Sequence, residues 1–293
     1  MNVDVIENIL PQIDDIGIII VPLTIVRKCD TCQELFVQAL GAPGHWWDEF
    51  LSNEPGLSSA GYFGCEELTD EDGDSLAHVS WLRSSIKDAK NIGEGYKWET
   101  IEIFTHWSTR RKRSIVAIFS ENATLSDQFA HELSQNVKAS NDPFWVYPRI
   151  FGVISRLQSR ACHEIQQSKE LLVSPGRYVP HEMTLYNLWR NATVIAETIE
   201  INLCSLSSIL AQHGRFVPEP EDRITASRQR LMLRKLRSER SEVHQPRQQL
   251  GAEHTSRQVQ DRLLYFQQVF RGYGATMASI KELLRFVTRG PAP

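Results

Sequence analysis

The feature that most constrains the fold is a heptad repeat near the end of the chain. Nine apolar positions alternate steps of four and three residues without interruption: Val259, Leu263, Phe266, Phe270, Tyr273, Met277, Ile280, Leu284 and Val287. This period brings them onto one stripe of an α-helix, where they pack against neighbouring helices. The sequence therefore predicts a long helix over about 259–287, and we interpret the seven positions from Leu263 to Leu284 as its packing residues.

Two more long helices are predicted upstream of this repeat. Asp142-Pro143 combines an N-cap acceptor with a proline suited to the first helical position, and apolar residues follow at helical spacing. A second apolar stripe lies in a helix expected over about Pro180–His213. The break between the two helices, Ser174-Pro175-Gly176, is short, which favours antiparallel packing.

The first 140 residues change period often, as small mixed α/β layers do. The clearest strand runs from Lys97 to Trp107, with β-branched and aromatic residues in alternation, and Ser114 to Phe119 is its expected partner. The polar connection between them has hairpin length, so we expect antiparallel pairing. Around this hairpin we predict a short strand over 18–26, helices over 31–40 and 45–51, a turn-rich acidic stretch over 53–74 and a helix over about 126–137.

These periods predict an α+β protein in two parts. An acidic α/β sandwich domain is expected over 1–140, and long antiparallel helices with coiled-coil-like packing are expected over 141–293. Charge divides the chain near the same place, because the formal net charge of −4 hides −13 over residues 1–108 and +9 over residues 109–293. With 41% hydrophobic and 23% charged residues, the composition is that of a soluble globular protein and excludes disordered and collagen-like classes.

Cysteines and apolar runs indicate the compartment. Five scattered cysteines are too few for a secreted disulfide scaffold, so a reducing compartment is expected. The first apolar run is interrupted by Gly17 and Pro22 and lacks a basic segment before it, which excludes a signal peptide. A membrane span needs about 20 predominantly apolar residues. No stretch reaches that length without charges, so we expect no transmembrane segment and a cytoplasmic location.

Few clusters of residues in the sequence could bind a metal ion or act in catalysis. The acidic group after Gly64 supplies carboxylate oxygens, which suit magnesium or calcium, but its spacing does not fit an EF-hand loop. A solvated loop is the simpler interpretation, and the candidate metal ligands are Glu66, Glu67, Asp70, Asp72 and Asp74. Cys29 and Cys32 lack the second ligand pair that a structural zinc site needs. No nucleophile elbow, phosphate-binding loop or dinucleotide fingerprint occurs, so we assign no catalytic residue and no certain cofactor.

Basic residues gather between the second and third long helices, in a polar stretch at about 214–256 that we expect to be a mobile excursion. Its run over 223–240 contains a single acid, Glu239. Such a run can bind phosphate groups or an anionic membrane surface, and the candidate residues are Arg228, Arg230, Arg234 and Lys235. No RNA-binding or zinc-finger motif accompanies it, so a nucleic-acid partner is not expected, and a solvated or partner-facing segment is the simpler interpretation.

The order of these parts resembles the cytosolic portion of CorA-like magnesium and other divalent-metal transporters, in particular the divergent fungal proteins of that group. The likeness covers the chain from about residue 40. It rests on aromatic and heptad motifs: Trp46-Trp47-Asp48-Glu49-Phe50 with Gly61-Tyr62-Phe63-Gly64, Trp98 to Trp107, Asp142-Pro143-Phe144-Trp145, Tyr186-Asn187-Leu188-Trp189 to Leu210, and Leu263 to Val287.

The resemblance implies an α/β/α sandwich followed by stalk helices that pack into a funnel-shaped pentamer, and it suggests magnesium as the ion. In the family, the third long helix continues into two membrane spans with a Gly-Met-Asn signature at the pore entrance. Here the helix is expected to end near Val287, before a tail that contains glycine and proline, and neither spans nor signature follow. Ion conduction and the family's metal-binding residues therefore do not carry over to this chain.

Three functions are consistent with these features. The leading hypothesis is a non-enzymatic protein with an assembly, regulatory or partner-binding role, which associates with itself or with a helical partner and reaches the cytosolic face of a membrane through that partner. The alternative is a peripheral module that binds anionic lipid or nucleic acid through residues 223–240. A third is an enzyme whose site joins an acidic residue with His78 or His106 from distant parts of the chain.

Overall fold

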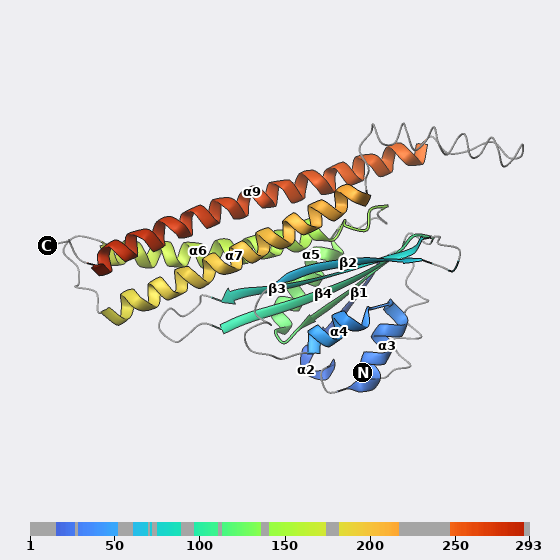
Figure 1. The fold of residues 1–293 in the computed structure, drawn as a ribbon, viewed down its shortest axis with the longest axis horizontal. Helices are drawn as coiled ribbons and strands as arrows, with labels where there is room; N and C mark the ends of the chain where they lie inside the picture. The colour runs from blue at the N-terminus through green and yellow to red at the C-terminus, as the bar shows by residue number, and fades with distance from the viewer. Residues whose placement is uncertain are drawn as a thin grey trace, which may run out of the picture.

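The computed structural model describes residues 16–26, 29–51, 61–69, 71, 75–88, 97–110, 113–135, 141–173, 182–216 and 247–289. The described strands form one mixed sheet in the order β1-β5-β4-β3-β2 (Figure 1). β1 runs parallel to β5, and the other neighbours are antiparallel. The predicted hairpin is confirmed as the β4–β5 pair. The strands are β1 (Ile16–Pro22), β2 (Tyr62–Thr69), β3 (Ser75–Asp88), β4 (Lys97–Ser108) and β5 (Ser114–Ser120).

Helices cover both faces of this sheet, as Figure 1 shows. Three short helices lie on one face: α2 (Leu23–Val26), α3 (Asp30–Leu40) and α4 (Gly44–Leu51). On the other face lie α5 (Ala123–Ser134), α6 (Tyr147–Val173) and α7 (Glu182–Phe216), and α9 (Arg247–Arg289) packs against α7 and α6. The predicted α+β fold, a layered α/β unit followed by long packed helices, is therefore confirmed.

The central strands are buried on both faces, so their side chains alternate between two cores. In β4, Ile103 belongs to the core beneath the long helices, whereas Phe104 belongs to the core beneath the short helices. The second core is rich in aromatic rings: the ring centroids of Trp46 and Phe104 are 4.8 Å apart, and those of Phe36 and Phe119 are 5.3 Å apart. The aromatic pair after Gly44 thus fixes α4 onto the sheet.

A glycine in β2 is required by its cross-strand partner. Gly64 lies opposite Trp81 of β3, and a Cβ at this position would overlap the Trp81 indole. At Gly61, a Cβ would lie 2.6 Å from the Arg83 carbonyl oxygen and 2.7 Å from Ile201 of α7. The glycines at both ends of the Gly61–Gly64 segment therefore allow the close approach of neighbouring backbone and side chains.

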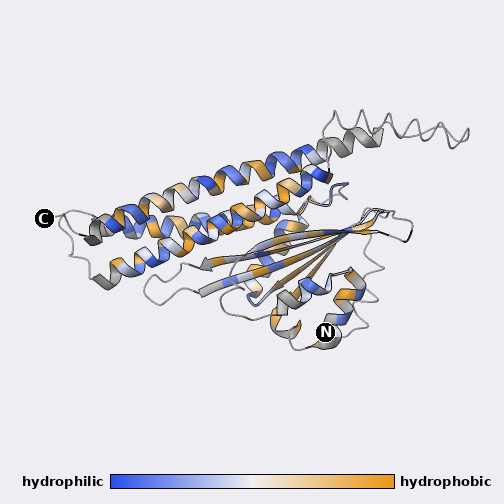
Figure 2. Ribbon diagram, viewed as in Figure 1, coloured by the Kyte–Doolittle hydropathy of each residue, from blue (hydrophilic) through white to orange (hydrophobic). Residues whose placement is uncertain are grey.

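The three long helices run antiparallel in succession, α6 to α7 to α9 (Figure 1). Apolar and polar residues alternate along each of them (Figure 2). Phe151 of α6 and Phe270 of α9 meet edge to face, with ring centroids 6.1 Å apart. Polar bonds also join the helices: Gln158 donates its Nε2 hydrogen to Thr198 Oγ1 over 3.0 Å. The predicted antiparallel packing is confirmed.

Two strands differ from the sequence-based expectation. The stretch over 53–74 was expected to consist of turns, but its residues 62–69 form β2. The neighbouring β3 was not predicted, because polar side chains stand on both of its faces. Ser80, Ser84 and Arg83 are buried there and contact partners far away in the sequence, so local alternation of apolar and polar residues is lost.

Several element ends also differ. β1 ends at Pro22, and the last four residues of the strand expected over 18–26 form α2 instead. Pro143 opens a turn over 143–146, so α6 begins at Tyr147. α7 extends to Phe216 and α9 begins at Arg247, so both ends of the excursion expected over 214–256 are helical. The rest of that segment lies outside the described residues.

The division into domains at residues 140 and 141 stays a prediction. One apolar core extends across that position, since Ile103 and Phe129 belong to the same cluster as Phe151 and Phe270. The two parts therefore share buried surface in the described chain.

One described helix is long and apolar enough to cross a membrane by length and composition, although no transmembrane segment was expected from the sequence. It spans Leu185–Phe216 of α7, and 39% of its most apolar window is buried inside the protein. Its outer side carries Glu197 and Glu200, and its inner side bonds to the sheet, with Ser84 Oγ donating to Asn202 Oδ1 over 3.0 Å. These contacts are typical of a helix in a protein core. Such a helix also meets the criteria of length and hydropathy for a membrane span.

Candidate functional site

The predicted acidic metal site is divided between the two faces of the sheet. Glu66 and Glu67 are consecutive in β2, and consecutive side chains of a strand point to opposite faces. Glu66 Oε1 lies 3.6 Å from Nε2 of His45 on the side of the short helices, whereas Glu67 pairs across the strands with His78. Within the described part of the chain, no group of three or more His, Cys, Asp or Glu side chains could hold a metal ion. The remaining candidates, Asp70, Asp72 and Asp74, lie outside the described residues.

The predicted anion-binding residues also lie outside the described part of the chain. These are Arg228, Arg230, Arg234 and Lys235. The metal and anion sites therefore both stay predictions from the sequence.

The predicted packing stripe of α9 faces inward. Tyr273 OH lies 3.5 Å from Ser155 Oγ of α6, and the Phe266 ring lies next to Gly152 of the same helix. Five of the seven residues are fully buried and two are partly buried: Leu263, Phe270, Met277, Ile280 and Leu284, then Phe266 and Tyr273. This stripe is buried against other helices of the same chain. An assembly of several chains would therefore need another surface.

The outer face of α9 carries exposed apolar and small residues that were not predicted as a contact surface. Leu264 and Tyr265 are exposed there, Tyr265 to 63%. Small exposed residues continue the same face toward the end of the helix: Gly272, Ala275, Thr276 and Ser279. The signal in the sequence was a large aromatic followed by small residues at helical spacing, on the side away from the apolar seam. Tyrosine and small residues together suit a close helix–helix contact.

A second candidate site lies where the last turn of α7 meets the turn before α6. His213 Nε2 lies 2.8 Å from Asp142 Oδ2, and the two side chains are 1% and 0% exposed. The backbone N–H of Phe144 donates to the other carboxylate oxygen, Asp142 Oδ1, over 2.8 Å. The sequence predicted that Asp142 caps the start of the first long helix. Asp142 instead caps the turn over 143–146, which precedes that helix. Its partner 71 positions later was not predicted.

Aromatic rings surround this pair. The Phe144 ring lies 5.4 Å from the His213 ring and 4.9 Å from the His78 ring, measured between centroids. Phe216 closes the group, 6.2 Å from His78 and 6.0 Å from Trp107. Burial lowers the pKa of His78 to about 4, although the carboxylates of Glu67 and Asp142 act in the opposite direction. His78 is therefore neutral near pH 7.

Buried hydroxyls connect the sheet to the start of α6. Tyr147 OH donates to Ser80 Oγ over 2.7 Å, and Ser80 Oγ lies 2.5 Å from Thr105 Oγ1. Burial raises the pKa of the Tyr147 phenol, since a charged phenolate would be desolvated there. The group therefore stays neutral and acts as a fixed hydrogen-bond donor.

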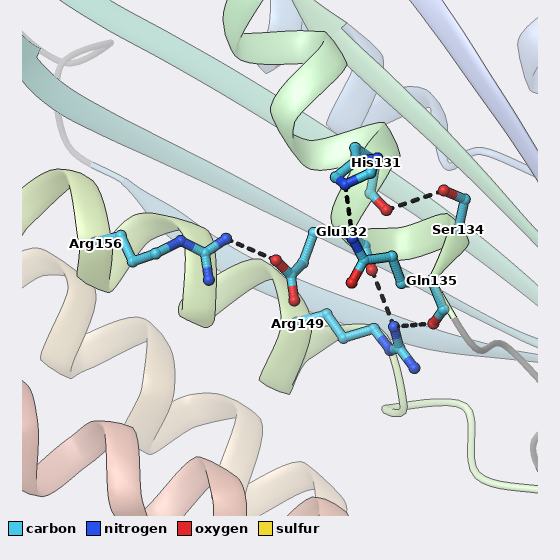
Figure 3. Close-up of polar contacts among 6 residues, drawn as sticks. All are labelled: His131, Glu132, Ser134, Gln135, Arg149 and Arg156. Carbon is cyan, nitrogen blue, oxygen red and sulfur yellow. Dashed lines mark hydrogen bonds and ion pairs between the residues drawn. The ribbon is translucent and has the colours of Figure 1, made fainter.

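An arginine-rich contact joins α5 to α6 (Figure 3). Arg149 Nη1 donates to the backbone oxygens of Glu132 and Gln135, over 2.9 and 2.5 Å, which satisfies carbonyls at the end of α5. Arg156 Nη2 lies 2.6 Å from Glu132 Oε2. Burial lowers the pKa of Arg149, the carboxylate of Glu132 acts in the opposite direction, and Arg262 of α9 lowers it further. Because these arginines already bond to α5, the contact is structural.

The two histidines considered for catalysis do not come together. His78 pairs with Trp107 in the sheet register and lies on the side of the long helices, whereas His106 pairs with Val79 of the other core. Burial lowers the pKa of His106. The hypothesis from the sequence needs only one of these imidazoles beside an acidic residue, and Glu67 lies opposite His78 in the sheet register, so this hypothesis stays a prediction.

No family model matches the sequence, and no curated protein matches it. Among solved structures, the fold is similar to the ZntB cytoplasmic domain from Vibrio parahaemolyticus, with a TM-score of 0.45, 10% identity, 88% of this chain covered and 84% of that one. It is also similar to full-length CmaX, with a TM-score of 0.47, 14% identity, 93% of this chain covered and 68% of that one. At these identities and TM-scores the likeness concerns only the general arrangement of the fold.

Proposed function

We propose that this chain is a non-catalytic assembly module of the kind that the resemblance to CorA-like cytosolic domains implies, and that it associates with a second copy of itself through the outer face of α9. The observation that carries this proposal is the exposure of Leu264 and Tyr265, to 42% and 63%, on a helix whose other face is fully used.

The composition of this face supports a protein partner. Tyrosine offers a large, rigid contact area at low entropic cost and is enriched among residues that dominate binding energy. Further along α9, Gly272 and Ala275 are exposed, and no atom lies within 4 Å of a Cβ added at Gly272. A second helix can therefore approach this part of the backbone closely.

Charge on the same helix favours a specific rather than a purely apolar contact. Asp261, Arg262 and Arg271 are exposed on the same helix as Leu264 and Tyr265. Charged residues at the rim of an interface fix its register, because wrong pairings bring like charges together. A regulatory role at the cytosolic face of a membrane, through a partner, belongs to the same proposal, as does magnesium as a ligand of the assembled form.

Sedimentation equilibrium of the full chain tests this proposal. Replacing Leu264 and Tyr265 with serine is expected to raise the dissociation constant for self-association at least about tenfold, since each 1.4 kcal/mol of lost binding energy gives tenfold. Tyr186→Ser is the matched control, because Tyr186 is similarly exposed but lies on α7. A monomer at all concentrations, with or without magnesium, or equal association of the double variant, would contradict the proposal.

The alternative function, binding of anionic lipid or nucleic acid through residues 223–240, concerns residues outside the described part. It stays a prediction from the sequence. Binding to anionic vesicles that is lost on neutralising Arg228, Arg230, Arg234 and Lys235 would support it over self-association.

A further inference from the structure

Two features of the described structure anchor the last turn of α7. Its buried side chain, His213, bonds to Asp142, a residue of the turn that precedes α6. Its final residue, Phe216, is 40% exposed and rests on the rings of His78, Trp107 and Phe144. A buried polar bond and the edge of an aromatic cluster therefore help to fix the position of this turn among the described residues.

His78 is the titratable group beneath this turn. Its ring contacts Phe144 and Phe216, and its Nδ1 atom is buried with no hydrogen-bond partner among the described residues. A proton on this imidazole would bring a positive charge between two aromatic rings, in a place where water does not reach Nδ1. Such a charge costs free energy unless the site opens to solvent.

The charged groups that face His78 come from three elements. Glu67 of β2 and Asp142 of the turn before α6 favour a proton on His78, but the desolvation of the ring is the larger effect. From α7, His213 bonds to the same Asp142, and Arg215 acts on Cys65, which lies two residues before Glu67 in β2. From β4, the neighbour of His78 is the uncharged Trp107.

We propose that the turn His213–Phe216 is an acid-released latch: protonation of His78 favours a state in which this turn leaves Phe144 and Trp107, and the imidazolium is hydrated. In the released state His78 has the ordinary pKa of an exposed histidine, about 6.5, whereas in the latched state burial lowers its pKa to about 4. The ratio of released to latched molecules therefore rises about tenfold per pH unit below 6.5, and about 300-fold in total.

Hydrogen exchange of the full chain between pH 7 and pH 4.5 tests the latch. After correction for intrinsic exchange, protection of the amides over 209–216 is expected to change little above pH 6.5 and to fall about tenfold per pH unit below it. Protection over 150–161, in the buried part of α6, is expected to stay constant. A parallel loss in both segments, or constant protection in both, would overturn the proposal, since the first means global acid unfolding and the second means no release.

A substitution at position 78 identifies the titrating group. His78→Phe removes the proton site and keeps a planar ring, so protection over 209–216 is expected to become independent of pH. His163→Gln is the matched control, because His163 is exposed on α6 and is expected to leave the pH dependence unchanged. If His78→Phe does not fold, His78→Gln serves the same purpose, and so does the NMR titration of His78 in the unaltered chain. Release that persists without His78, or a His78 pKa above 6, would overturn the assignment.

Discussion

The carboxylate of Asp142 and the imidazole of His213 lie 2.8 Å apart in the interior, and they join two segments that are 71 positions apart. The same carboxylate accepts the N–H of Phe144, so both of its oxygens have partners. One side chain thus sets the start of the long-helix bundle and the end of its second helix.

Replacing Asp142 is therefore expected to destabilise the whole protein. Asp142→Ala removes both bonds and leaves His213 buried without its partner, which costs about 3 kcal/mol, as for one member of a buried pair. Asp142→Asn keeps an acceptor for the Phe144 N–H and should cost less. Urea unfolding of both variants measures the two values. An Asp142→Ala variant as stable as the unaltered chain would show that the pair adds nothing.

The hydroxyl of Tyr147 gives a second, smaller prediction. Tyr147→Phe removes the bond to Ser80 Oγ and keeps the ring in place, while Ser80 retains Thr105 as a partner. The expected loss is about 1 kcal/mol in the free energy of urea unfolding. Tyr186→Phe, on the exposed side of α7, is the control and should have no effect. A cost of several kcal/mol at position 147 would mean that the ring has moved.

The parts of the fold that were predictable are those whose signal is local. The long helices follow from apolar spacing alone, and the β4–β5 hairpin follows from alternation and connection length. β3 could not be predicted, because it contains a buried charge. Arg83 Nε lies 3.4 Å from Glu102 Oε1 of β4, and the two side chains are only 6% and 1% exposed. In the sequence these residues have the signature of an exposed surface. Their burial depends on a partner in another strand.

Among the candidate sites, too, only residues with a local sequence signal could be predicted. The inward stripe of α9 was recognised, but only the position of α6 and α7 shows that it is used within the chain, which leaves Tyr265 as the outward residue. The contact between His213 and Asp142 has no local signal at all. His213 has the spacing of a residue in the last turn of a helix, and nothing near it in the sequence points to a carboxylate.

Alanine substitutions at two glycines are expected to change the free energy of unfolding in opposite directions. At Gly64 a Cβ would overlap the Trp81 indole, so Gly64→Ala forces the ring to move, with a cost of about 1–3 kcal/mol. At Gly272 nothing lies within 4 Å of the added Cβ, and alanine favours the helix by about 0.5–1 kcal/mol. Urea unfolding at low protein concentration measures both. Equal effects at the two positions would contradict the strand–strand contact.

The two arginines between α5 and α6 are expected to differ in what they contribute. Arg149 donates to two backbone oxygens at the end of α5, and no other described side chain bonds to those oxygens. Arg149→Ala is therefore expected to cost about 1.5 kcal/mol and to reduce amide protection over 129–135. Arg156 bonds to Glu132 with 59% of its side chain exposed, so water and salt screen the pair.

For Arg156→Ala we expect a loss below about 1 kcal/mol, which disappears in about 1 M sodium chloride, whereas the loss at Arg149 should persist because its acceptors are uncharged carbonyls. Urea unfolding of both variants at low and high salt measures this contrast. Arg149→Lys is a useful third variant, since one ammonium group can reach one or both carbonyls, and partial recovery is expected. A salt-dependent loss at Arg149, with none at Arg156, would show that the charge of Arg149 acts on an acid rather than on the helix end.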